Sequence, residues 1–143
     1  PGYPWAWKMT VWIGVPHSAS QINVAAQLAD DSSVLAYYRA LIDARHRIGA
    51  ATDGGFTRLD MGDPALFFYL REHEDSSILV ATNLSSRALT PSPRGGHEAA
   101  CALPWRLYLA NTRGSGVASE NAPTPVDPAS PMGPWEARVY LIH

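Results

Sequence analysis

The first regular pattern of apolar and polar positions along this chain is helical. Between Ser33 and Arg47 the apolar side chains recur every three or four residues, so they share one face of a helix. That face holds Val34, Tyr37, Tyr38, Leu41 and Ile42, together with the stem of Arg45. Asp31 or Ser32 can cap its start and Gly49 its end. The pattern therefore predicts an amphipathic helix over residues 31–49.

After the helix, the apolar period shortens to two residues, which is typical of strands. Gly54–Asp60 alternates, with Phe56, Arg58 and Asp60 on one face and Thr57 and Leu59 on the other. Further strands are expected at 65–71, 78–84, 105–111 and 135–143, with Leu107 and Leu109 on one side of their strand. The polar stretch 72–77 predicts a hairpin between the second and third strands. The proline-rich stretch 112–134 predicts a long loop.

Helix first and strands afterwards is a segregated order, and short strands between turn signals favour a sandwich. The predicted fold class is mainly β, an antiparallel β-sandwich preceded by one amphipathic helix. We expect three parts: an irregular segment over 1–30, the helix over 31–49 and the β-domain over 54–143. Trp105 and Trp135 begin strands and are expected to pack inside the sandwich.

The composition of the chain gives no support to two classes of function, nucleic-acid binding and membrane binding. The chain has 143 residues, 46% hydrophobic and 17% charged, with a net charge of −2. This balance gives no electrostatic basis for binding nucleic acid or an anionic membrane, and no apolar run is long enough for a membrane helix. Cys101 is the one cysteine, so no disulfide can form within the chain and a reducing compartment, the cytoplasm, is expected.

Candidate reactive groups are scattered. Cys101 lies in an apolar context and is interpreted as a small buried hydrophobe. The acidic residues around His73 fall in a predicted turn, and Asp60 and Asp63 offer too few oxygens for a Ca²⁺ loop. His97–Glu98 is expected at the surface. No phosphate loop, cysteine pair or nucleophile elbow occurs. The prediction is therefore no catalytic residue, no metal and no cofactor.

Several stretches occur in an order that resembles a known enzyme family. They are Trp12–Val15, Ile22–Val24 with Gln27, Asp31–Ile42 with Arg45, Gly55–Phe56, Phe68–Arg71, Ile78–Ser85 and Pro134–Leu141. Together they resemble the C-terminal end of α-amylase-type glycoside hydrolases, in the oligo-1,6-glucosidase and α-glucosidase branch. The resemblance covers about residues 12–143. Val11 stands where the family usually has proline, and residues 1–11 match nothing in the family.

The resemblance implies a position within a larger enzyme. In that family a (β/α)8 barrel is followed by an antiparallel β-sandwich called domain C. On this basis residues 12–28 resemble the last barrel loop, residues 31–48 the last barrel helix and residues 54–143 domain C. We expect the chain to end where the family ends and to lack the barrel that precedes it.

The resemblance also implies where the chemistry is found. Retaining glycosidases need two carboxylates about 5–5.5 Å apart, and barrel enzymes carry them at strand ends. The family also uses an Asn-His-Asp motif, but none of the five histidines here precedes an aspartate. The parent is expected to be a retaining α-glucosidase, and this chain is expected to be inactive alone.

Three hypotheses for the role remain open. The first is a structural domain that braces the last barrel helix and covers part of the catalytic barrel, its partner. The second is a carbohydrate-binding module, in which Trp5, Trp7 and Trp12 stack on an α-gluco-oligosaccharide. The third is a catalytically inactive subunit that binds other proteins. In the isolated chain, the uncovered helix face around Tyr37 and Leu41 is expected to favour self-association.

Overall fold

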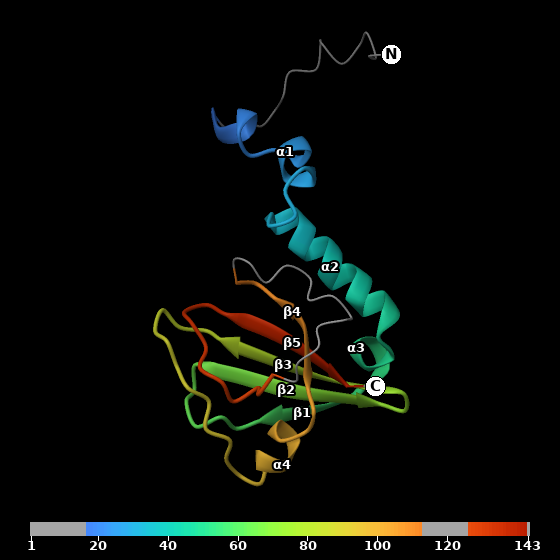
Figure 1. Cartoon of the computed structure of the whole chain (residues 1–143), viewed down its shortest axis with the longest axis vertical. Helices are drawn as coiled ribbons and strands as arrows, with labels where there is room; N and C mark the ends of the chain where they lie inside the picture. Colours follow the sequence, from blue (N-terminus) through green and yellow to red (C-terminus); the bar gives the residue numbers. More distant parts are fainter. Residues whose placement is uncertain (1–16, 113–125, 143) are drawn as a thin grey trace.

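A computed structural model describes residues 17–112 and 126–142, which form a sheet with a helical arm beside it (Figure 1). The described part starts with helices. They are the 3-10 helix η2 (His17–Ser20), α1 (Val24–Leu28), α2 (Val34–Arg47) and α3 (Gly49–Asp53). We call α1 and α2 together the helical arm. Figure 1 shows α2 rising away from the sheet, while α3 lies against it.

The predicted helix is confirmed, but both predicted caps are wrong. Ser33 is the N-cap, and its Oγ accepts a hydrogen bond from the Ala36 amide at 3.1 Å. Asp31 and Ser32 lie instead in the preceding turn, where the Ser32 amide donates to Asp30 Oδ1 at 2.8 Å. Ile48 is the C-cap with extended backbone, and Gly49 begins α3. The chain therefore turns sharply at Ile48, and a second short helix follows.

The sheet has five strands, in the order β1-β2-β3-β5-β4, and every pair is antiparallel. The strands are β1 (Gly55–Leu59), β2 (Leu66–His73), β3 (Ser76–Asn83), β4 (Arg106–Ala110) and β5 (Ala137–Ile142). A short helix, α4 (Glu98–Cys101), lies in the long connection between β3 and β4. The predicted hairpin is confirmed: β2 and β3 pair in register from Leu66–Asn83 to His73–Ser76.

One strand departs from the predicted alternation. β4 carries a bulge, because Leu107 pairs with Tyr140 while Leu109 pairs with the very next residue, Val139. Leu107 therefore packs in the main core, whereas Leu109 lines a groove beside α2. The prediction that these two leucines share a side is wrong for this reason.

The two faces of the sheet differ in how they are covered. We call the first one the covered face, because α4 and the connecting loops pack on it. Its residues are completely or almost completely buried, and they form the main core with Trp105 and Met132. The strand residues of this core are Leu59, Leu66, Phe68, Leu70, Leu79, Ala81 and Tyr140.

We call the opposite one the helix-side face. At one end of it Ala44, Ile48 and Ala50 pack on Ile78 and Leu141, which makes a second and smaller core. Elsewhere on this face Leu109 is buried, but Phe67, Tyr69, Val80, Thr82 and Val139 are only half-buried. The α2–α3 corner therefore covers part of the helix-side face, and much of it stays open.

The predicted fold class is confirmed: the described residues form a mainly β domain whose antiparallel sheet follows a helix. Loops, α4 and an isolated bridge between Leu89 and Met132 build the layer on the covered face. Within residues 17–112 and 126–142, no helix combines the length and apolar character needed to cross a bilayer.

Candidate functional site

The helical arm exposes a row of apolar side chains. Val34, Tyr38 and Ile42 follow one another at four-residue steps along α2, and they are 68%, 60% and 56% exposed. The sequence places these residues on the apolar face of the helix, the face expected to be buried. Within α2, only Ala44 is buried in this structure. We call Val34, Tyr38 and Ile42 the apolar stripe.

The start of the helical arm continues this exposure. Ile22, Val24 and Leu28 are all more than half exposed. Gln27 joins α1 to α2: its carbonyl accepts from Ser33 Oγ at 2.7 Å, and its side-chain oxygen accepts from the Leu35 amide at 3.0 Å. The exposed apolar residues of α1 are therefore held at the N-terminal end of α2.

Arg71 attaches α3, the helix that follows the helical arm, to the sheet. Its guanidinium leaves β2 on the helix-side face and donates to the carbonyl oxygens of Ala51, Thr52 and Gly54, at 2.7, 3.2 and 2.8 Å. These carbonyls belong to the last turn of α3 and its C-cap, which have no partners inside the helix. The α2–α3 corner is thus fixed on the sheet by a charge-assisted contact.

A groove of about 1200 Å³ opens between α2 and the end of β4. Its helical wall includes Tyr37, Arg39 and His46, and its floor is formed by Leu109 and Ala110. This volume is larger than that of most small-ligand pockets, and the groove presents both apolar and charged side chains.

The carboxylates singled out in the sequence do not assemble into a reactive pair. A cleft of about 440 Å³ brings together Asp60, Asp63 and His97. Each aspartate serves its own turn, since Asp60 Oδ1 accepts from the Gly62 amide and Asp63 Oδ1 from the Ala65 amide, both at 2.9 Å. Among the residues described, no group of three or more His, Cys, Asp or Glu side chains could hold a metal ion.

Two predictions about individual reactive groups are confirmed. Cys101 is buried in the main core, and this burial raises the pKa of its thiol, to which Asp127 and Glu98 add by charge repulsion. A raised pKa suits a packed thiol and not a nucleophile. Glu72, Glu74 and Asp75 are exposed at the β2–β3 turn, as expected for a solvated loop.

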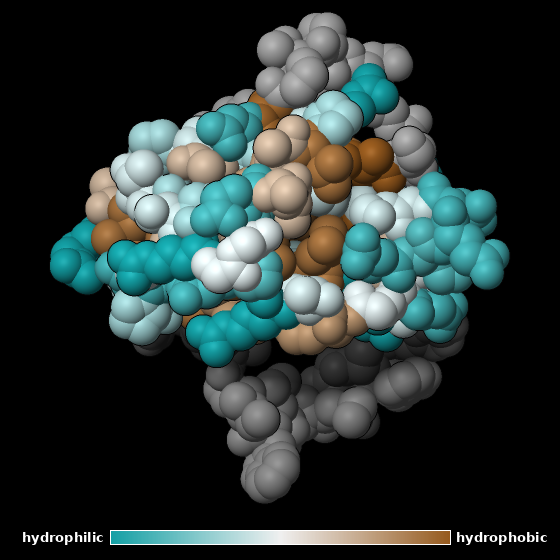
Figure 2. Space-filling view, turned by 90° about the horizontal axis from the view of Figure 1, so that it is seen from below, coloured by the Kyte–Doolittle hydropathy of each residue, from teal (hydrophilic) through white to brown (hydrophobic). Residues whose placement is uncertain are grey.

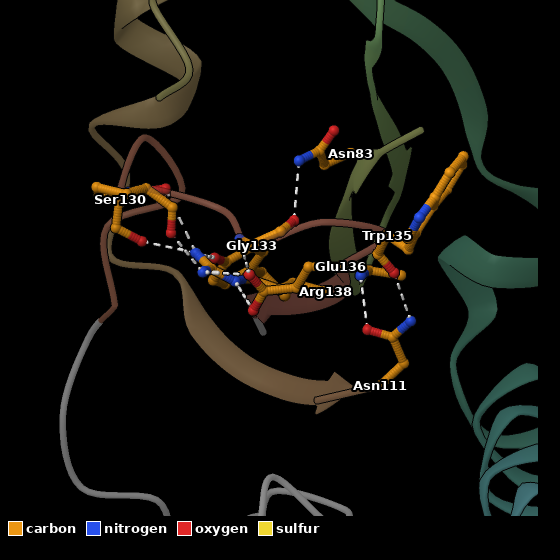
Figure 3. A network of polar contacts seen from close by, with 10 residues as sticks. Asn83, Asn111, Ser130, Gly133, Trp135, Glu136 and Arg138 are labelled. Carbon is orange, nitrogen blue, oxygen red and sulfur yellow. Dashed lines mark hydrogen bonds and ion pairs between the residues drawn. The ribbon is translucent and has the colours of Figure 1, made fainter. Parts of the chain in front are cut away.

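A polar network lies where β5 begins (Figure 3). Arg138 donates from Nε to Glu136 Oε1 at 2.8 Å, from Nη1 to Ser130 Oγ at 2.7 Å and from Nη2 to the Pro131 carbonyl at 2.7 Å. Glu136 also accepts from the Gly133 amide at 2.6 Å. We call these groups the Arg138 network. They hold the loop that precedes β5 against the sheet.

The charge state of Glu136 follows from this network. Burial alone would raise the pKa of the Glu136 carboxyl, but the hydrogen bonds from Arg138 and the Gly133 amide, with the Arg138 charge, outweigh it and lower the pKa. Buried ions need partners of this kind, and each half of the pair stays charged because of the other.

Two asparagines extend the same loop anchoring. Asn83 is buried, and its Nδ2 donates to the Gly133 carbonyl at 2.8 Å and the Arg87 carbonyl at 2.6 Å. Asn111 holds the chain on both sides of Glu136: it donates to the Trp135 carbonyl at 2.9 Å and accepts from the Ala137 amide at 2.8 Å. Sequence reasoning missed this anchoring. The one local signal was a Glu and an Arg two residues apart inside an otherwise apolar strand.

The tryptophans divide differently from the prediction. Trp5, Trp7 and Trp12, proposed for sugar stacking, lie outside the described residues. Trp105 is completely buried, as expected, and donates from Nε1 to the Ala100 carbonyl at 2.7 Å. Trp135 is 62% exposed, so its predicted burial is wrong. It precedes β5 in a left-handed turn with φ of 56°, and its ring points away from the Arg138 network (Figure 3).

Comparison with known proteins shows which enzymes this chain is similar to. The chain is 31% identical over 133 residues to the oligo-1,6-glucosidase of Heyndrickxia coagulans, a match that covers 93% of this chain and 21% of that enzyme. It is 36% identical over 130 residues to the trehalose-6-phosphate hydrolase of Escherichia coli, covering 91% of this chain and 21% of the enzyme. The chain is homologous to the C-terminal part of α-amylase-type glycoside hydrolases. No protein-family model matches it.

Solved structures share the fold of this chain. The trehalose-6-phosphate hydrolase of Bacillus licheniformis matches with a TM-score of 0.69 and 21% identity over 91% of this chain. The isomaltulose synthase of Klebsiella sp. LX3 matches with a TM-score of 0.69 and 23% identity over 92% of this chain. In both cases the match takes up 22% of the larger protein. The chain thus spans about a fifth of the length of its relatives.

Proposed function

We propose that this chain is a non-catalytic, structural C-terminal domain of a glycoside hydrolase that acts on α-glucosides. In this proposal α2 is the last helix of the catalytic barrel, and the β-domain braces that helix and covers one side of the barrel. Oligo-1,6-glucosidases and trehalose-6-phosphate hydrolases among the relatives support the substrate class. A cytoplasmic location fits the single, buried thiol of Cys101.

The observation that carries this proposal is the apolar stripe. A helix with apolar residues on one face is stabilised mainly by burying that face. Here Val34, Tyr38 and Ile42 are more than half exposed, and α2 meets the β-domain mainly through its C-terminal turn. About four-fifths of each relative lies outside the matched part. A barrel in that remaining part supplies the missing cover for the stripe.

The chemistry of the described residues supports a non-catalytic role. Asp60 and Asp63 accept hydrogen bonds within their own turns, and the charged Glu136 is paired with Arg138. A retaining glycosidase needs one free carboxylate as nucleophile and a second one as acid, both facing the sugar. None of these groups is placed for that task in the part of the chain that the structure covers.

Catalytic competence is tested directly by incubating this chain with p-nitrophenyl α-D-glucopyranoside and following the absorbance of p-nitrophenolate. We expect no release above that of buffer. Turnover that co-purifies with the chain, and is lost when the chain is unfolded in urea, would show that it is an enzyme and overturn the proposal.

The bracing role is tested in the complete polypeptide encoded by the gene that carries this chain, which we call the joined enzyme. An Ile42→Ser change in the stripe is expected to shorten the half-life of its α-glucosidase activity at elevated temperature at least fivefold. Leu103→Ser, which alters a 48% exposed residue beyond α4, is the matched control and should leave the half-life unchanged. Equal half-lives for the two variants would contradict bracing through α2.

A further inference from the structure

One tight turn carries a side chain that its backbone geometry does not favour. Residues 133–136 form a β-turn, in which the Glu136 amide donates a hydrogen bond to the Gly133 carbonyl at 3.3 Å. Pro134 occupies the second position of this turn and Trp135 the third, and Trp135 has a φ of 56°. Among the residues that the structure describes, it is the one non-glycine residue with positive φ. A turn with proline second and a positive φ third usually has glycine at that third position.

Local stability does not account for tryptophan at this position. In the left-handed region the Cβ of a residue other than glycine crowds the following carbonyl, so glycine would relieve the strain. Burial offers no compensation, because Trp135 is 62% exposed and belongs to neither hydrophobic core. Strained residues cluster at binding sites and active sites, so an exposed one is a candidate for function.

Hydrogen bonds on both sides hold the Trp135 main chain in this conformation. Its amide donates to the Ser85 carbonyl at 3.0 Å. Its carbonyl accepts from Asn111 Nδ2 at 2.9 Å (Figure 3). The turn itself is anchored through the Gly133 carbonyl, which accepts from Asn83 Nδ2 at 2.8 Å. The turn thus presents one indole ring on a fixed support, and binding to that ring requires little ordering of the backbone.

Polar residues flank this ring. Ser85 and Asn111, which bond to its main chain, are polar themselves, and the residues that follow them, Ser86 and Thr112, are exposed. Leu84, which is 59% exposed, adds one apolar side chain next to Ser85. An exposed ring with such neighbours suits a ligand that is apolar on one face and polar around its edge.

The surface at the β1 and α4 end of the molecule is different. Seen from that side, apolar side chains gather near the middle of the surface between hydrophilic margins (Figure 2). Contiguous apolar surface of this kind suits a contact with another protein. Trp135 lies elsewhere, because it precedes β5, which β2 and β3 separate from β1 in the sheet. The turn therefore offers a single ring and not an extended patch.

We propose that Trp135 is a binding site for one glucose ring of an α-linked gluco-oligosaccharide. A glucopyranose ring presents C–H groups on its faces and hydroxyl groups around its edge. It therefore stacks on the negative face of the indole ring, while its hydroxyl groups stay in water or meet polar side chains. The choice of α-linked glucose rests on the proposed function, in which the enzyme acts on α-glucosides. The stacking rests on the exposure and the strained, fixed backbone of Trp135.

The test adds isomaltose to this chain and follows two NMR signals, the indole N–H of Trp135 and the amide of Glu136. We expect both signals to shift and to saturate. Trp135→Tyr keeps an aromatic ring, so the shift of the Glu136 amide should remain, whereas Trp135→Gly should abolish it. Leu103→Ser, at a residue that is 48% exposed, is the matched control and should behave as the wild type. A shift of the Glu136 amide that persists in Trp135→Gly would place the sugar elsewhere and overturn the proposal.

Stability separates a presented ring from a packed one. Because glycine relieves the strain at a positive φ, the urea midpoint of Trp135→Gly should equal or exceed that of the wild type. A lower midpoint would show that the Trp135 ring stabilises the fold, and it would overturn the assignment of this ring to a ligand.

Two further outcomes would also overturn the proposal. If isomaltose shifts neither signal up to its solubility limit, Trp135 binds no glucose ring. If hydroxyl-radical oxidation of Trp135 is about fivefold lower in the joined enzyme than in this chain, the ring belongs to a contact inside the enzyme. Neither outcome bears on the bracing role of α2, which the half-lives of Ile42→Ser and Leu103→Ser test separately.

Discussion

The two faces of the sheet share the same five strands and yet differ in how completely they are used. On the covered face, Phe68, Leu79 and Tyr140 have no exposed surface, and loops closed by the Arg138 network lie over them. On the helix-side face, their neighbours Tyr69, Val80 and Val139 stay half-buried, although they are as apolar. The difference shows that this chain buries one face by itself and leaves much of the other half-buried. In the proposed function, the catalytic barrel covers the second face.

The two faces also differ in how the layer on each one is attached to the sheet. Hydrogen bonds between distant positions hold the loop layer, such as the one that Asn83 Nδ2 donates to the Gly133 carbonyl. Arg71 holds the helical layer by donating hydrogen bonds to backbone carbonyls at the end of α3. Within residues 17–112 and 126–142, α2 has no comparable hydrogen bond to the sheet. The loop layer is thus fixed along its length and the helical layer at one corner.

The largest expected effect comes from a substitution at the centre of the covered face. Trp105→Ala should lower the free energy of unfolding by about 3–5 kcal/mol, because it leaves a cavity and removes the bond to the Ala100 carbonyl. Trp135→Ala is the matched control: its ring is 62% exposed, and we expect a change within about 0.5 kcal/mol. Urea unfolding followed by circular dichroism measures both. Equal costs at the two positions would contradict the assignment of the covered face.

A somewhat smaller effect is expected in the Arg138 network, which holds the loop layer on the sheet. Arg138→Met should cost about 3 kcal/mol, because Glu136 would remain buried without its cation. The double variant Glu136→Gln/Arg138→Met should recover part of this loss, since no charge is then left unpaired. The same urea titration gives the values. A double variant less stable than Arg138→Met would show that the pair contributes little through its charges.

Neighbouring residues on β3 sharpen the contrast between the faces. Leu79→Ala should cost about 3 kcal/mol, because Leu79 is fully buried in the main core. Val80→Ala, one residue along on the helix-side face, should cost no more than about 1 kcal/mol in this chain, since part of its side chain is already in water. A difference of less than about 1 kcal/mol between the two would mean that the faces are equally well packed.

Lowering the pH should destabilise the covered face, because it protonates Glu136. Its folded pKa lies below the unfolded value of about 4.3, so its stabilising effect is complete above that value and is lost as the pH falls through the folded pKa. We expect stability to fall as the pH drops below about 5 and through the folded pKa, with a shallower slope for Glu136→Gln. Unfolding midpoints measured across this range give both slopes. Identical slopes would exclude Glu136 as a source of acid sensitivity.

Local patterns predicted much of this fold. Short apolar runs between turn signals placed β2 and β3, and the three- and four-residue steps placed α2, because these elements depend on neighbouring residues. The bulge at Tyr108 and the left-handed turn at Trp135 could not be foreseen, since both depend on how β4 meets β5. The contacts of Asn83 to the Gly133 carbonyl join positions 50 residues apart, and no local pattern signals them.

The apolar stripe shows what an apolar pattern in the sequence leaves open. The sequence correctly placed Val34, Tyr38 and Ile42 on one face of α2, but an apolar face says only that something covers it. The structure leaves these residues exposed, so the sequence pattern refers to a contact that the described residues do not make. For the same reason, the apolar residues of the helix-side face gave no sign in the sequence that they differ from those of the covered face.

The most direct measurement is hydroxyl-radical footprinting of Phe56 and Tyr69, read by mass spectrometry, in this chain and in the joined enzyme. If the catalytic barrel completes the helix-side face, oxidation of both rings should fall at least fivefold in the joined enzyme, while Leu103 reacts equally in the two proteins. Equal oxidation of Phe56 and Tyr69 in both would show that this face stays in water. That result would contradict the account.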